Sequence, residues 1–246
     1  MQIIIIHYKP LADRHEYYQN TKFFMNSNLR FLKADDREEI NWCFNTLFFS
    51  QQQSAWAVEL KELIPILLFN SGMTTSILPA TDTDLSSIPD WAKARQLKES
   101  EISLIYKHHL ALLLASHNED PTFILEDDAL LKPDTVDRIP SILSEFKESK
   151  LDYLDLAGGC NLPMQSSEVA NSSGITYLNI PRSRTTAGYL VSPKAALKLG
   201  NALFPISLPL DWSFQKIFLR YNFKVGWCIP ELFRHGSQDI YTSSIQ

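Results

Sequence analysis

The sequence predicts an α/β fold in a single domain, with a mixed, mostly parallel β-sheet flanked by helices. Short apolar runs typical of buried strands alternate along the chain with segments whose apolar residues recur at helical spacing. The chain has 246 residues, of which 45% are hydrophobic, and this is enough for one substantial core. It contains no internal repeat and no low-complexity tract. We therefore expect one domain over residues 1–246.

The N-terminal part of the chain begins with a predicted buried strand. Residues 3–7 are almost wholly apolar, which favours a strand that is covered on both faces. A helix with a polar face is expected over residues 13–26, and a second short strand over residues 28–33. Residues 37–98 are harder to assign and include a loop rich in Asp, Ser, Thr and Pro, so we interpret them as a variable insertion within the domain.

The middle of the chain gives clearer signals. Ser100 is predicted to be the N-cap of a helix that reaches Asn118, because apolar residues recur there at helical spacing. A short apolar strand is expected over residues 122–125. Pro140 suits the first turn of the next helix. The buried face predicted for that helix consists of Ile139, Ile142, Leu143 and Phe146.

The C-terminal part is predicted to add strands and two helices. Ser192 and Pro193 form a good N-cap and first-turn pair for a helix that ends near Leu203. Asp211 is predicted to cap a last helix that reaches Tyr221. Strands are expected over residues 151–156, 189–191 and 224–229.

The charge balance excludes some classes of function. With 23 basic and 28 acidic side chains the formal net charge is −5, whereas a nucleic-acid-binding protein needs a basic excess to contact phosphates. We therefore expect no nucleic-acid partner. Cys43, Cys160 and Cys228 are far apart and form no CxxC pair, so neither a disulfide framework nor a structural zinc site is expected. This use of cysteine favours a reducing compartment.

No targeting or membrane-spanning segment is predicted. The apolar start at residues 3–6 is too short for a signal sequence, and no run approaches the roughly 18 apolar residues of a transmembrane helix. We expect a cytoplasmic protein. A peripheral contact with the inner face of the cytoplasmic membrane remains open.

The strongest local signal is a run of three carboxylates, Glu126, Asp127 and Asp128, directly after an apolar strand. In an extended conformation Glu126 and Asp128 point to one side and Asp127 to the other. Adjacent carboxylates repel one another unless something neutralises them, and their oxygens suit a hard divalent cation, Mn²⁺ or Mg²⁺. The alternative interpretation is a solvated acidic turn in which Asp127 only caps the next segment of the chain.

Taken together, four blocks of the sequence resemble glycosyltransferase family 25, the lipooligosaccharide and lipopolysaccharide type. They occur in the family's order and span nearly the whole chain. Three positions depart from the family pattern, since Ser100, Leu104 and Lys107 replace its Gly, Cys and Ser. The blocks are Arg14 after the first strand, residues 101–108 (EISLIYKH), residues 124–128 (ILEDD), and the pair 187–194 (AGYLVSPK) and 208–212 (LPLDW).

The resemblance implies a GT-A fold with a Rossmann-like nucleotide-binding half, and it assigns roles to the carboxylates. Asp128 is expected to bind the metal ion directly. Glu126 is expected to be a second ligand of the metal site or to contact the ribose or the metal-bound water, and Asp127 to orient the sugar. His235 is a candidate third metal ligand, with an exposed loop histidine as the alternative. His108 is expected at the donor site, with a satisfied core histidine as the alternative.

Further candidate residues lie outside the carboxylate run. By resemblance the enzyme is inverting, so Asp211 is a candidate general base for the acceptor hydroxyl, and Trp212 offers a flat face for an acceptor sugar. The alternative is that Asp211 only caps its helix and Trp212 packs in the core. Arg182 and Arg184 could neutralise a diphosphate. The remaining donor-site candidates are Arg14, Tyr8 for stacking on the base, and Gly158 and Gly159 for close approach of the sugar.

The sequence as a whole predicts a metal-dependent hexosyltransferase. The expected donor is a UDP-hexose of galactose or glucose type. The expected acceptor is a saccharide or lipid-linked oligosaccharide in the synthesis of lipooligosaccharide or another cell-surface glycan. Two rival functions remain open: a metal-dependent phosphohydrolase or nucleotidyltransferase that uses the same carboxylates, and a non-catalytic module that binds a nucleotide sugar or a glycan.

Overall fold

A computed structural model describes residues 2–8, 12–21, 28–34, 97–204, 206 and 208–236. The proposed insertion at residues 37–98 lies almost wholly outside the described residues, so it stays a prediction, as does the single domain. Residues 22–26 of the first predicted helix also lie outside them.

The described residues form a mixed sheet whose strands mostly run in one direction. β2, β1 and β3 are parallel to one another, as are β5 and β8, whereas β7 runs antiparallel between β3 and β5, and β6 runs antiparallel at the edge. The predicted mixed α/β fold is therefore confirmed. The seven strands, in sheet order, are β2 (Asn28–Ala34), β1 (Gln2–Tyr8), β3 (Thr122–Glu126), β7 (Gly188–Val191), β5 (Tyr153–Asp155), β8 (Val225–Cys228) and β6 (Ile175–Tyr177).

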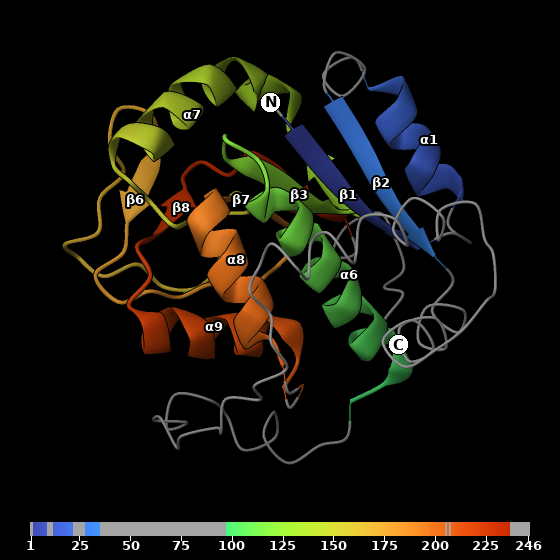
Figure 1. Cartoon of the computed structure of the whole chain (residues 1–246). Coiled ribbons are helices and arrows are strands. Elements are labelled where there is room, and N and C mark those ends of the chain that lie inside the picture. Colours follow the sequence, from blue (N-terminus) through green and yellow to red (C-terminus); the bar gives the residue numbers. More distant parts are fainter. Residues whose placement is uncertain are drawn as a thin grey trace.

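Helices cover both faces of this sheet and give a three-layered architecture (Figure 1). On one face, Ile4 and Ile6 of β1 pack with the apolar side chains of α6 (Glu99–Ser116), α8 (Pro193–Ala202) and α9 (Leu210–Tyr221). On the other face, Ile3 and Ile5 pack with Tyr18 of α1 (Ala12–Asn20) and with α7 (Ile139–Glu148). Because β1 is buried on both faces, its run of isoleucines shows no alternation with polar residues.

Two helix starts differ from the predictions. The N-cap of α6 is Lys98 rather than Ser100, because the side chain of Glu101 accepts a hydrogen bond from the Lys98 backbone N–H (2.9 Å) and so extends the first turn. The N-cap of α9 is Pro209, so Asp211 lies inside the first turn and the prediction that it caps the helix is wrong. The cap of α8 is confirmed, since Ser192 Oγ accepts a hydrogen bond from Ala195 N.

The predictions for β3, α7 and β5 are confirmed in outline. The buried residues of α7 are Ile139, Ile142 and Phe146, and Leu143 packs against the same cluster. Three short strands were not predicted: β6, β4 (Ala129–Leu131) and β9 (Phe233–His235). Each has only three residues, too few to show a period. A 3₁₀ helix, η2 (Pro133–Arg138), leads from β4 into α7.

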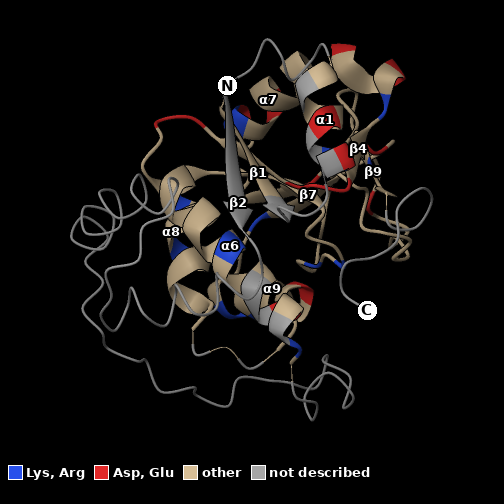
Figure 2. Ribbon diagram, turned by 90° about the vertical axis from the view of Figure 1, so that its right-hand side faces the viewer, with Lys and Arg blue, Asp and Glu red and all other residues tan. Residues whose placement is uncertain are grey.

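Charged positions are unevenly distributed over the described part of the chain. Figure 2 shows basic positions along α8 and acidic positions on α1 and beside β4. The turn between β3 and β4, with Glu126, Asp127 and Asp128, is among these acidic positions. Within the described ranges, no helix is both long enough and apolar enough to cross a bilayer.

Candidate functional site

The turn after β3 separates its three carboxylates in the way that an extended chain predicts. Glu126 and Asp128 turn to one side, where they meet His235. Asp127 turns to the other, where its Oδ1 accepts a hydrogen bond from Arg14 Nη1 at 2.6 Å. Arg14 and Asp127 are both buried, so each neutralises the other. This pair holds the turn against α1, and the donor-binding role expected of both residues stays a prediction.

Two tyrosines of α1 also hold the turn, and sequence reasoning missed both. The Tyr18 hydroxyl lies 2.8 Å from the carbonyl oxygen of Glu126 and 2.7 Å from that of Ala129. Tyr17 accepts a hydrogen bond from the backbone N–H of Leu131 at 2.9 Å. The backbone of the acidic turn is therefore fixed by a helix more than 100 residues earlier in the chain. No local sequence pattern predicts these contacts of Tyr17 and Tyr18 with the turn.

His235 reaches the turn because β9 pairs with β4. In this small antiparallel sheet Ala129 lies opposite His235, and Gly236 N donates a hydrogen bond to Asp128 O at 2.7 Å. One ligand atom from each of Glu126, Asp128 and His235 lies within 4.8 Å of the other two. The structure thus brings the three predicted metal ligands together, and His235 is a strand residue rather than an exposed loop histidine.

The chemistry of these three side chains fits a divalent cation. Nδ1 of His235 is buried and has no hydrogen-bond partner among the described residues, and the nearest charged atom is Asp128 Oδ2 at 3.4 Å. Carboxylate oxygens favour Mg²⁺ or Mn²⁺, and an imidazole nitrogen shifts the preference towards the first-row ion Mn²⁺. Glu126, Asp128 and His235, called here the metal triad, are therefore suited to bind Mn²⁺ or Mg²⁺.

The buried side chain of His108 and the hydroxyl of Thr186 both lie close to the Glu126 carboxylate. His108 is fully buried; its Nε2 lies 3.4 Å from Glu126 Oε1 and its Nδ1 lies 2.9 Å from the Tyr189 hydroxyl. Burial lowers the pKa of His108. Burial by itself raises the pKa of Glu126, but His108, His235 and the Thr186 hydroxyl more than offset this, and the pKa is lowered. His108 does not line the pocket in front of Glu126. Its imidazole ring contacts Glu126 and the buried rings of Tyr189 and Phe214, so its donor-site role stays a prediction.

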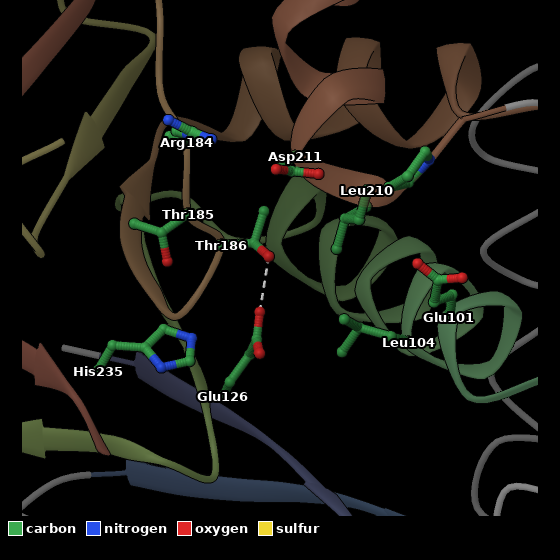
Figure 3. Close-up of a pocket in the computed structure, with 10 residues that line it drawn as sticks. Glu101, Leu104, Glu126, Arg184, Thr185, Thr186, Leu210, Asp211 and His235 are labelled. Atoms are coloured by element: carbon green, nitrogen blue, oxygen red, sulfur yellow. Dashed lines mark hydrogen bonds between the residues drawn. The ribbon is translucent and has the colours of Figure 1, made fainter. Parts of the chain in front are cut away.

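Two members of the metal triad, Glu126 and His235, line this pocket, which has a volume of about 210 Å³. Figure 3 shows Glu126 and His235 on one side of it and Asp211 and Arg184 on the opposite side, with Glu101 of α6 on a third side. Two of the predicted metal ligands, Glu126 and His235, and the predicted base Asp211 thus face the same space. The lining residues are Glu101, Leu104, Glu126, Arg184, Thr185, Thr186, Pro209, Leu210, Asp211 and His235.

Asp211 has the environment expected of a general base. It is half-buried in the first turn of α9. Burial raises the pKa of Asp211 above its usual value, and the nearby charge of Glu126 adds to this, whereas backbone N–H groups of the helix start and the charge of Arg184 act in the opposite direction. Trp212 is half-buried and does not line the pocket, so its role towards an acceptor stays a prediction.

The two candidate arginines have different environments. Arg182 donates hydrogen bonds to Glu168, which hold the pKa of that carboxyl at about 2, and its guanidinium lies 4.6 Å from the centre of the Trp227 ring. Arg182 is therefore committed to a structural contact. Arg184 is exposed and lines the pocket.

Buried side chains from three elements hold the segment 181–187, called here the arginine loop. Asp155 of β5 accepts a hydrogen bond from Ser183 Oγ at 2.7 Å. Gln215 of α9 accepts from Ser183 N and donates to Pro181 O, and Trp227 of β8 donates to Arg182 O. Gln215 lies one helical turn after Asp211, so α9 carries the candidate base and also anchors the arginine loop.

Asp155 gives a stability prediction. Burial raises its pKa from 3.8 to about 6. The unfolded protein therefore ionises this carboxyl more easily than the folded protein does, and the free energy of unfolding falls by up to about 3 kcal/mol as the pH rises from 3.8 to 6. In Asp155→Asn the amide oxygen can still accept from Ala157 N, and the amide N–H can donate to Ser183 Oγ, whose hydroxyl can then donate to Thr185 O. We expect the variant to be more stable than wild type above pH 6 and equally stable near pH 3.8. Denaturant unfolding at pH 4 and pH 8 measures this, and an equal difference at both values would contradict it.

The two predicted sugar-facing glycines have a structural explanation. Gly158 and Gly159 have φ values of 68° and 75°, a left-handed conformation that favours glycine. A Cβ atom on Gly159 would also lie 2.5 Å from Cε2 of Trp227. Neither glycine lines the pocket, so the predicted approach of a sugar to them is not supported by a contact here. Tyr8 ends β1, but its side chain lies outside the described part of the structure.

The cysteines lead to a second prediction. Cys228 is buried with its pKa raised to about 11, so it acts as a small apolar side chain, and Cys160 is half-buried. Cys43 lies outside the described residues. We expect a variant with all three replaced by alanine to keep its turnover, with some loss of stability at position 228. A folded variant without turnover, judged by its circular dichroism and its activity, would show that one cysteine has a role in the reaction.

Comparison with known proteins gives one family. The sequence model of a family described as Glycosyltransferase family 25 (LPS biosynthesis protein) matches residues 1–214. The match includes the acidic turn and Asp211 but ends before His235. A search of curated proteins finds no significant match.

Proposed function

Because the chain belongs to glycosyltransferase family 25, a family of LPS biosynthesis proteins, we propose that it is an inverting hexosyltransferase. Its donor is a UDP-sugar of galactose or glucose type, and its acceptor is a saccharide or lipid-linked oligosaccharide of a cell-surface glycan. The observation that carries the proposal is the shared pocket: Glu126 and His235 of the metal triad line the same space as Asp211, although the three residues come from distant parts of the chain.

The metal triad provides the donor side of this proposed site. Departure of UDP places negative charge on the diphosphate, and a bound Mn²⁺ or Mg²⁺ offsets such charge as a Lewis acid. Asp128 and His235 would hold the ion directly, and Glu126 would hold it or its water. Thr186 and His108 keep the Glu126 carboxylate aimed into the pocket, since both lie against its Oε1. The mixed sheet with this site at the end of β3 is compatible with a GT-A fold.

Asp211 provides the acceptor side. In an inverting reaction the acceptor hydroxyl attacks the anomeric carbon from the face opposite the leaving group, and a base removes its proton. Asp211 lies across the pocket from Glu126 and His235, which matches this arrangement (Figure 3). Burial raises the pKa of Asp211, and a raised pKa makes its carboxylate a stronger base for the hydroxyl proton.

A panel of nucleotides and nucleotide sugars, each with and without Mn²⁺, tests the proposal by thermal shift. A ligand at 100 times its dissociation constant stabilises the folded state by about 2.7 kcal/mol, which corresponds to a rise of about 5–10 °C for a protein of this size. We expect the largest rise with a UDP-hexose and Mn²⁺. The best donor is then incubated with saccharide acceptors, and release of UDP is measured.

The same assays separate the rival functions. Acceptor-independent breakdown of the donor as the only reaction would favour a hydrolase, and release of pyrophosphate from a nucleoside triphosphate would favour a nucleotidyltransferase. A donor that binds but is never consumed would favour a non-catalytic module.

A further inference from the structure

One positive side chain of the pocket has no role in the proposed reaction so far. Arg184 is the single Lys or Arg that lines the pocket within the described residues. The pocket otherwise carries the carboxylates of Glu101, Glu126 and Asp211, which repel an anion. The guanidinium of Arg184, which lines the same pocket as these carboxylates, either balances their negative charge or binds an anionic ligand.

The backbone that carries Arg184 is built to hold its position. The residues on both sides of Arg184 are anchored, because Ser183 binds Asp155 and Gln215, and Thr185 accepts a hydrogen bond from Ala187 N at 3.1 Å. Asp155 is fully buried and Gln215 nearly so. An exposed arginine on a fixed backbone loses less conformational freedom when it binds a ligand than one on a free loop does.

Arg184 lies on the side of the pocket where the acceptor would bind. In Figure 3 it is next to Asp211 and across from Glu126 and His235. Its charge acts on the pKa of Asp211, whereas the side chains that lower the pKa of Glu126 are His108, His235 and Thr186. The diphosphate of the donor belongs with the metal triad, so a second anion site beside Asp211 is available to the other substrate.

We propose that Arg184 binds an anionic group, a carboxylate or a phosphate, on the acceptor saccharide. This inference rests on the proposed function. The planar guanidinium donates paired hydrogen bonds to either group, and this recognition adds directionality that a neutral sugar hydroxyl does not provide. The acceptor is therefore an acidic or phosphorylated saccharide, and Arg184 selects it over a neutral one.

Binding of simple probes to the protein saturated with UDP and Mn²⁺ tests this proposal. The probes are glucose, glucuronate and glucose 6-phosphate, and their dissociation constants are measured by ligand-observed NMR titration. The variants are Arg184→Gln and the charge-matched control Arg220→Gln, whose residue is exposed on α9, lies against Tyr221 and does not line the pocket.

We expect wild type to bind at least one acidic probe about tenfold more tightly than glucose. The preference should disappear in Arg184→Gln and persist in Arg220→Gln, while the affinity for UDP with Mn²⁺ stays within about twofold in both variants. Preference for glucuronate alone identifies a sugar acid, and preference for glucose 6-phosphate alone identifies a phosphorylated sugar.

Three results would overturn the assignment of Arg184. The first is a wild-type protein that binds UDP with Mn²⁺ but shows no preference for either acidic probe. The second is a preference that survives in Arg184→Gln, as expected if the guanidinium only balances Asp211. The third is a loss of UDP affinity in Arg184→Gln that equals the loss for the probes, which would place Arg184 on the diphosphate. Absence of UDP binding in wild type itself would contradict the proposed function, and the acceptor assignment with it.

Discussion

Asp211→Asn is expected to lower turnover by about 10²–10⁴-fold, the effect typical of a lost acid–base group. The substitution keeps the size of the side chain. It does not remove a helix cap, because Pro209 is the cap of α9. Because the pKa of Asp211 is raised in the folded protein, its ionised form costs stability, so we expect no loss of stability in the neutral variant. Turnover at saturating acceptor, the melting temperature and the dissociation constant of UDP are measured on the same preparation.

The pH dependence of turnover provides an independent check on Asp211. Burial raises its pKa above 3.8, so wild-type turnover should fall as the pH falls through this raised value, because the protonated carboxyl cannot accept a proton. The asparagine variant should lack this decline. Asp134→Asn, an exposed acid in the first turn of η2 and outside the pocket, is the matched control and should leave both the rate and the profile unchanged.

Near-normal turnover in Asp211→Asn would exclude Asp211 as the base. The structure makes two other acids poor replacements, since Asp127 is paired with Arg14 and Glu231 with Lys132. The remaining candidates that line the pocket would be Glu101 and His235.

Asp128→Asn is expected to remove metal binding and, with it, donor binding. The substitution replaces a charged ligand oxygen by a neutral amide in a site of three ligands, and we expect the affinity for Mn²⁺ to fall at least about 100-fold. The hydrogen bond from Gly236 N goes to the backbone carbonyl of Asp128 and is retained, so the β4–β9 pairing should persist. The loss of the free Mn²⁺ signal in electron paramagnetic resonance measures the binding.

The control for this variant is Asp120→Asn. Asp120 is exposed and paired with Lys147 at the surface, so its loss makes the same change in net charge and should leave Mn²⁺ binding intact. Unchanged Mn²⁺ affinity in Asp128→Asn would show that the ion, if it binds, uses other ligands.

Local rules were sufficient for the parts of the fold and site that depend on neighbouring residues. Burial of β1 on both faces follows from its unbroken isoleucines. The alternation of side chains in an extended chain predicts that Glu126 and Asp128 share a side while Asp127 turns away. Ser192 and Pro193 start α8 through contacts within one turn, which their identities specify directly.

The features that the sequence did not reveal depend on contacts between distant residues. His235 was a candidate metal ligand by resemblance, but the pairing of β9 with β4 that brings it to the acidic turn was not predicted, because each of these strands is too short to be recognised alone. Arg184 faces the pocket and Arg182 does not, because Glu168 and Trp227 hold the Arg182 side chain elsewhere. The helix start at Pro209 overrides the good capping preference of Asp211, because a side chain already inside the first turn cannot cap it.

Calorimetric titration of UDP into the wild-type protein, with Mn²⁺ and then with an excess of chelator, tests the central claim most directly. The metal triad is expected to bind UDP through the divalent ion, so binding should be measurable with Mn²⁺ and should fall below detection in chelator, and it should return when Mn²⁺ is restored. Equal UDP affinity in the two solutions would contradict a metal-dependent donor site at Glu126, Asp128 and His235.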